Sequence, residues 1–206
     1  MPQAAPLRGA ENRRAQALLF VSLVAVGMGQ TIVFAVLPPL GREIGLVEVQ
    51  VGAIISASSM MFFLASPIWG RASDRFGRKK VLLAGLVGYT VGTIVFASLF
   101  FAALRGWLAT LPAFIAVVLA RMGQSSLMSA TPPAASAYMA DITNVTERTK
   151  GMGRIGAANN VGSIAGPAIG GMLATISLLS PLYFAAAVPL LAAVLVAWGL
   201  REPPRH

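Results

Sequence analysis

One arginine stands inside an otherwise uncharged stretch and is the residue best placed for chemistry within a membrane. Arg121 is the single charge between about Pro112 and Ala140, a segment long enough to cross a bilayer. A charge at that depth costs about 3 kcal/mol on insertion scales, so it normally faces a polar cavity. Arg121 lies about ten residues, or roughly 15 Å, from the outer end of its segment. An alternative in which its side chain reaches the membrane surface therefore stays open.

The acidic residues decide whether the chain can carry protons by itself. None of the seven lies in the middle of an uncharged stretch. Proton coupling usually needs an intramembrane carboxylate whose pKa is raised by desolvation. Asp141, near the inner end of the segment that holds Arg121, is the nearest candidate. From the acids alone, no proton acceptor other than Asp141 is evident in this chain.

Polar amides within the apolar stretches are candidates for lining a substrate cavity. They are Gln30, Asn159 and Asn160. A buried amide can equally tie two helices together, so both interpretations remain. A set of methionines and phenylalanines is able to form an adaptable pocket, although packing or lipid contact is the favoured interpretation. Its members are Met28, Met60, Met61, Met128, Phe62 and Phe63.

Six apolar segments must position these side chains. The chain of 206 residues is 56% hydrophobic, more than a water-facing exterior permits. Helices are predicted near 15–38, 49–69, 81–103, 112–139, 153–176 and 182–200. The sequence thus predicts an all-α membrane protein: a cytoplasmic lead at 1–14, a six-helix transmembrane domain at 15–200, and the start of a central loop at 201–206. The longest loop is predicted at about 140–152.

The positive charge is distributed as membrane topology requires. If the N-terminal side is cytoplasmic, only Arg42 and Arg105 fall outside, and Arg121 lies within the membrane. The other thirteen cations fall inside, a strong bias that predicts cytoplasmic N- and C-terminal sides and disfavours nucleic-acid binding. The chain has no cysteine, and no metal cluster, nucleophile–base pair or cofactor loop is evident. We predict no enzyme activity, no metal and no cofactor.

Two stretches combine glycines with other residues at a spacing that helix packing alone explains only in part. The segment 70–80, "GRASDRFGRKK", holds six charges, and its Gly77 permits a turn that a Cβ would penalise. Its Asp74 can cap a helix or pair with a nearby arginine. The segment 151–171 carries glycines at a spacing of four, which lets another helix approach closely. Its small and bending residues are Gly153, Gly162, Gly166, Pro167, Gly170 and Gly171.

Together these stretches resemble the major facilitator superfamily, over about residues 15 to 202. The loop between its second and third helices matches at Gly70, Asp74, Arg75, Gly77, Arg78, Lys79 and Leu82, with Ala72 in place of leucine. "RMGQSS" is similar to its R-x-x-q-G element, with Ser125 in place of glycine. The glycine pattern matches at all six positions the fifth-helix signature that marks proton-coupled drug antiporters.

The resemblance implies a fold, a function and roles for these residues. It implies the N-terminal half of a transporter, built from two three-helix inverted repeats, that exports drugs by alternating access and is driven by a proton gradient. The loop with Asp74 would act as a conformational latch. Arg121 would serve proton transfer or anion attraction, in a proton or charge relay with Gln124 and Asp141. The expected location is a cell membrane, the bacterial inner membrane.

Six helices are half of what this family has, so a second six-helix half is the expected partner besides lipid and a small-molecule substrate. That half would belong to the same chain in a longer protein, to a second copy, or to a companion subunit. The alternative function is a non-transporting remnant or scaffold subunit.

Overall fold

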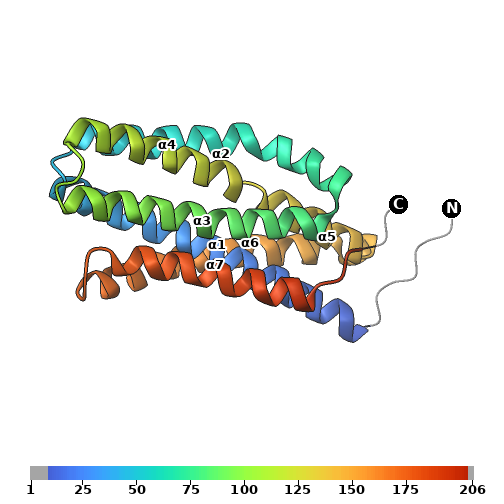
Figure 1. The fold of residues 1–206 in the computed structure, drawn as a ribbon. Coiled ribbons are helices and arrows are strands. Elements are labelled where there is room, and N and C mark those ends of the chain that lie inside the picture. The colour runs from blue at the N-terminus through green and yellow to red at the C-terminus, as the bar shows by residue number, and fades with distance from the viewer. Residues whose placement is uncertain (1–8, 204–206) are drawn as a thin grey trace.

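The computed structural model describes residues 9–203, and all regular structure in that range is helical. The helices lie side by side along one long axis (Figure 1). They are α1 (Gly9–Glu43), α2 (Glu48–Phe76), α3 (Arg78–Leu104), α4 (Thr110–Met128), α5 (Thr131–Ile142), α6 (Val145–Ala174) and α7 (Ser180–Gly199). The all-α prediction is confirmed.

Five helical stretches are long and apolar enough to cross a membrane by length and composition, with α4 and α5 counted as one. The helix α6 is not among them, because its glycines and the amides Asn159 and Asn160 lower its mean hydropathy. Its first turns carry the charges Glu147, Lys150 and Arg154. Its remainder, from Ile155 to Ala174, still provides about 20 uncharged residues, the length that a spanning helix needs.

The predicted boundaries need four corrections. The segment 70–80 is helical except at Gly77, and α1 already begins at Gly9 inside the expected lead. The predicted loop at 140–152 is mostly helix, because α5 continues to Ile142 and α6 starts at Val145. The helix predicted over 112–139 is broken after Met128, since Pro132 and Pro133 have no N–H to donate to the preceding turn.

The core is divided into two apolar clusters with a polar layer between them. In α3 one cluster holds Val81 to Tyr89 and the other Phe96 to Phe100. In α4 the order is reversed, as an antiparallel neighbour requires, with Val117 in one cluster and Met128 in the other. The buried polar residues between the clusters are Thr90, Thr93, Arg121, Gln124 and Ser125. The fold therefore places Arg121 in the middle of the bundle.

Candidate functional site

A cavity of about 220 Å³ lies where α1, α2, α4, α5 and α6 meet. Two of its lining residues, Ser59 and Asn159, are exposed, so the cavity opens on the side of the bundle. Its wall is mostly apolar, with a few amides and hydroxyls. The lining residues are Val26, Gly27, Gln30, Ser59, Phe62, Met128, Pro132, Asn159 and Ser163.

The structure brings two of the three predicted amides into this cavity. Gln30 and Asn159 both line it, whereas Asn160 is exposed outside it. Phe62 and Met128 contribute from the aromatic and methionine set, while Phe63 and Met60 are exposed elsewhere on the surface. An apolar wall with two amides suits an organic molecule that carries a few hydrogen-bonding groups.

Close packing of α1 against α6 shapes one side of the cavity. A Cβ on Gly162 would lie 2.5 Å from the carbonyl oxygen of Val24. A Cβ on Gly166 would collide with the side chain of Thr31 and lie 2.7 Å from the carbonyl oxygen of Met28. These two glycines let the backbones touch, and this contact holds Asn159 beside Gln30.

The glycine pattern of α6 serves two faces of the helix. Gly162, Gly166 and Gly170 are buried toward α1. Gly153, Pro167 and Gly171 are exposed, and a Cβ on Gly153 or Gly171 would meet nothing within 4 Å. Half of the pattern is thus explained by packing within the chain, and the other half lies on an uncovered surface.

Arg121 lies behind the cavity and is fully buried. One terminal nitrogen donates to Oε1 of Gln124, and the other lies 3.4 Å from Oε1 of Gln30. Gln30 therefore joins the cavity wall to the guanidinium. The side-chain amide of Gln124 donates in turn to Oγ1 of Thr93, whose hydroxyl donates to the carbonyl oxygen of Tyr89 at 2.8 Å.

Aromatic rings complete the surroundings of Arg121. The guanidinium carbon lies 5.3 Å from the ring centre of Phe34 and 6.0 Å from that of Phe96. Among the described residues no carboxylate pairs with Arg121. Its Nε and the hydroxyl of Tyr89 are buried without a protein partner, which costs about 1–3 kcal/mol for each group. The charge is thus held without an acid beside it, and Gln30 links it to the cavity wall. The alternative in which Arg121 reaches the membrane surface is wrong.

The predicted relay is not one cluster. Asp141 lies at the end of α5, where Oδ2 accepts from Nε of Arg78 at 3.1 Å. Asp74 pairs with the same guanidinium, and Oγ of Ser73 accepts from it at 2.7 Å. Asp141 therefore belongs with the charged segment at 70–80, apart from Arg121 and Gln124.

Gly77 and Lys79 of that segment contact α7 and the residues after it. Gly77 has a φ of +109°, which confirms the predicted turn, and a Cβ there would lie 2.6 Å from Oε1 of Glu202. Nζ of Lys79 donates to the carbonyl oxygen of Ala197 at 2.8 Å. The guanidinium of Arg75 lies over the ring of Phe76. A Cβ on Gly70 would meet only Pro133, at an ordinary contact distance of 3.9 Å.

Sequence reasoning missed the contribution of α3 to the arginine site. Tyr89, Thr93 and Phe96 lie on one face of that helix at spacings of four and three, toward Arg121 and Gln124. The signal was present, because two polar residues at that spacing interrupt an apolar helix. Gly92 completes it, since a Cβ there would lie 2.7 Å from Cβ of Gln124.

Comparison with known proteins gives consistent matches over nearly the whole chain. The profile of the Major Facilitator Superfamily matches residues 19–206. The chain is 35% identical over 188 residues to multidrug resistance protein 1 of Bacillus subtilis, covering 91% of this chain and 44% of that protein. It is 37% identical over 171 residues to the class C tetracycline resistance protein of Escherichia coli, covering 82% and 39%.

A solved structure shows the same fold at low sequence identity. A bacterial homologue of the human lysosomal transporter Spinster, in an inward-facing and unoccupied conformation, superposes with a TM-score of 0.79 at 18% identity. The match covers 97% of this chain and 45% of that one. The chain thus spans less than half the length of the relatives it matches here.

Proposed function

Because the chain belongs to the major facilitator superfamily, we propose that it forms one half of an exporter for drugs or other small organic molecules. The family is one of transporters, not of enzymes, and the chain is a multi-pass membrane protein, as the sequence predicts. The names of the multidrug and tetracycline resistance relatives support the substrate class.

The observation that carries this proposal is the side-opening cavity with Arg121 behind its wall. Phe62 and Met128 offer adaptable apolar contacts, and Gln30 and Asn159 offer hydrogen bonds. Gln30 also accepts from Arg121, so a ligand that moves Gln30 changes the environment of the buried charge. The cavity is open on one side of the bundle. The second six-helix half would provide the wall that faces it and encloses the substrate.

Transport would proceed by rocking of the two halves about this site. The exposed face of α6, with Gly153, Pro167 and Gly171, would lie against the second half, where small residues permit close sliding contact. Asp74 is two-thirds exposed although it pairs with Arg78, so one of its oxygens remains free to dock on that half. The segment 70–80 would then hold one of the two end states.

Energy would come from a proton gradient, with no cofactor. The described carboxylates of this chain lie at the ends of the bundle, as with Asp141 and Asp74 beside Arg78. The proton acceptor is therefore proposed to lie in the second half, with Arg121 tuning its proton affinity through the cavity. The proposed location is the bacterial inner membrane, with the cation-rich end of the bundle in the cytoplasm.

A matched pair of amides tests the cavity. Asn159→Leu, in the protein at its native length, is expected to lower ethidium export from cells more than tenfold, because it removes a hydrogen-bonding group from the wall. Gln50→Leu changes an amide in the first turn of α2, outside the cavity and away from the exposed face of α6, and is expected to lower export less than twofold. Equal export by the two variants, at equal amounts in the membrane, would contradict the proposal.

Reconstitution in liposomes distinguishes a transporter from the alternative of a non-transporting scaffold subunit. Liposomes that contain the protein at its native length are expected to move ethidium when a proton gradient is imposed. Absence of movement with correctly inserted protein, and recovery only when a second protein is added, would favour a non-transporting subunit.

A further inference from the structure

We propose that a pocket at the start of α1 and α6 binds a phosphate group, carried by a phospholipid headgroup or by a soluble anion. This pocket of about 190 Å³ is separate from the side-opening cavity, and the inference is independent of the proposed export function. Its lining residues are Gly9, Asn12, Arg13, Gln16, Thr143, Glu147, Lys150, Gly151 and Arg154.

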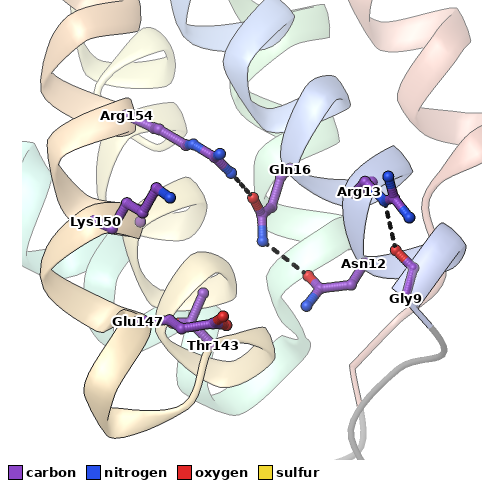
Figure 2. A pocket seen from close by; sticks show the side chains of 9 residues that line it. Gly9, Asn12, Arg13, Gln16, Thr143, Glu147, Lys150 and Arg154 are labelled. Atoms are coloured by element: carbon purple, nitrogen blue, oxygen red, sulfur yellow. Dashed lines mark hydrogen bonds between the residues drawn. The ribbon is translucent and has the colours of Figure 1, made fainter.

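The charge of the pocket favours an anion. Lys150 and Arg154 line the pocket from α6, and the single carboxylate in its lining is that of Glu147. Arg13 lies at its edge, where Nε donates to the carbonyl oxygen of Gly9 (Figure 2). Figure 2 shows Lys150 and Arg154 reaching from α6 toward α1. The pocket also touches the first residue of α1 and the first turn of α6, where the positive ends of two helix dipoles add to the field.

The side chains of the pocket are held in place before any ligand binds. Arg154 donates to Oε1 of Gln16, and Nε2 of Gln16 donates to Oδ1 of Asn12 at 3.1 Å (Figure 2). Nδ2 of Asn12 donates to the carbonyl oxygen of Ile142 at 3.2 Å. This chain of hydrogen bonds joins α6, α1 and α5, and it fixes the guanidinium by an amide that leaves its charge unneutralised.

Other arginines at the same end of the bundle are paired with carboxylates. Arg201 pairs with Glu11 at 3.0 Å, and Arg78 pairs with two carboxylates. Among the described residues, Arg154 has the amide of Gln16 as its acceptor and no ion pair. A guanidinium that is oriented and lacks a carboxylate suits the planar, two-pronged recognition of phosphate oxygens.

The surface next to the pocket favours a lipid as the source of the phosphate. Phe20 follows Gln16 by one turn on the same face of α1 and is 36% exposed. An acyl chain that leaves a headgroup in the pocket would run along this residue into the membrane. The position at the cation-rich ends of α1 and α6 matches the depth at which headgroups lie.

Calorimetry with two probes tests the proposal on the protein at its native length in a neutral detergent. The probes are a short-chain phosphatidylglycerol and inorganic phosphate. The double variant Lys150→Gln/Arg154→Gln is expected to weaken binding more than tenfold, because it removes two charge-assisted contacts. The matched control Lys80→Gln/Arg148→Gln removes two cations outside the pocket and is expected to change the affinity less than threefold.

A third variant keeps the test decisive if the double variant fails to fold. Glu147→Gln removes the one carboxylate and is expected to tighten binding several-fold, an effect that misfolding does not produce. Binding of phosphatidylglycerol without competition by inorganic phosphate would identify a headgroup site, and binding of both would identify a site for soluble anions. Binding of neither probe, or equal losses in the double variant and its control, would overturn the proposal.

Discussion

Two arginines of this chain are bound in opposite ways. Arg121, in the middle of the bundle, is surrounded by amide oxygens of Gln124 and Gln30 and by two aromatic rings. Arg78, at the cation-rich end, is a fifth exposed and pairs with Asp74 and Asp141. One charge is solvated by dipoles, and the other is neutralised by charges.

The difference follows from the dielectric surroundings and suggests different roles. A carboxylate beside Arg121 would be a second charge to desolvate, whereas amides solvate the guanidinium and leave its field acting on the cavity. Near water, pairing is inexpensive and contributes about 0–1 kcal/mol, so the contacts of Arg78 fix an arrangement that can be exchanged. Arg121 fits a role in binding and coupling, and Arg78 fits a role in a reversible contact.

The largest expected effect comes from removing the buried charge. Arg121→Gln should lower ethidium export more than tenfold with unchanged membrane insertion, because the cavity loses its fixed positive field. Arg78→Gln should lower export less, since other contacts such as that of Lys79 with Ala197 remain. Efflux from cells measures export, and immunoblots of membranes measure insertion. Full export by Arg121→Gln would show that the two arginines do not differ in their importance for transport.

The second effect concerns the amide that solvates Arg121. Gln124→Leu should lower the free energy of unfolding by about 2–3 kcal/mol, because it leaves a buried guanidinium and Thr93 without their partner. Gln50→Leu is the control, an amide on α2 whose oxygen accepts from the exposed backbone N–H of Val47. Thermal unfolding in detergent compares the two; equal stabilities would show that the network does not hold the charge.

A smaller effect is expected at the surface pairs. Asp74→Asn and Asp141→Asn should each lower the free energy of unfolding by less than about 1 kcal/mol, because Arg78 keeps the other carboxylate. Export should nevertheless fall several-fold in Asp74→Asn, if its exposed oxygen docks on the second half. A loss of stability as large as that of Gln124→Leu would mean that the pairs are structural.

The smallest effect is on the salt dependence of stability. Raising sodium chloride from 0.05 to 0.5 M should lower the Tm of the wild type by about 2 °C, because the surface pairs are screened. The dependence should become smaller in Asp74→Asn/Asp141→Asn, which keeps the pair of Arg201 with Glu11, and should be unchanged in Arg121→Gln. A salt dependence that instead follows Arg121 would contradict the assignment of the two environments.

The helical segments themselves were predictable, and their ends were not. Nearly uncharged stretches of about 20 residues located all six segments, because the absence of charge is a property of one segment and needs no knowledge of its neighbours. The charged segments at 70–80 and 140–152 looked like loops, yet both are largely helical, because α2, α3 and α6 continue past the apolar stretch. The break after Met128 had a visible cause in Pro132 and Pro133 that the apolar pattern concealed.

The sequence by itself determined that this chain crosses a membrane repeatedly, that its cations gather on one side, and that one arginine and a set of glycines lie within the spans. Only the tertiary structure decided that Asp141 joins Arg78 rather than Arg121, that Thr93 and Phe96 complete the arginine site, and that the glycines divide between two faces of α6. The physical reason is that hydropathy belongs to one segment, whereas the partner of a buried side chain depends on which helix faces it and at what height.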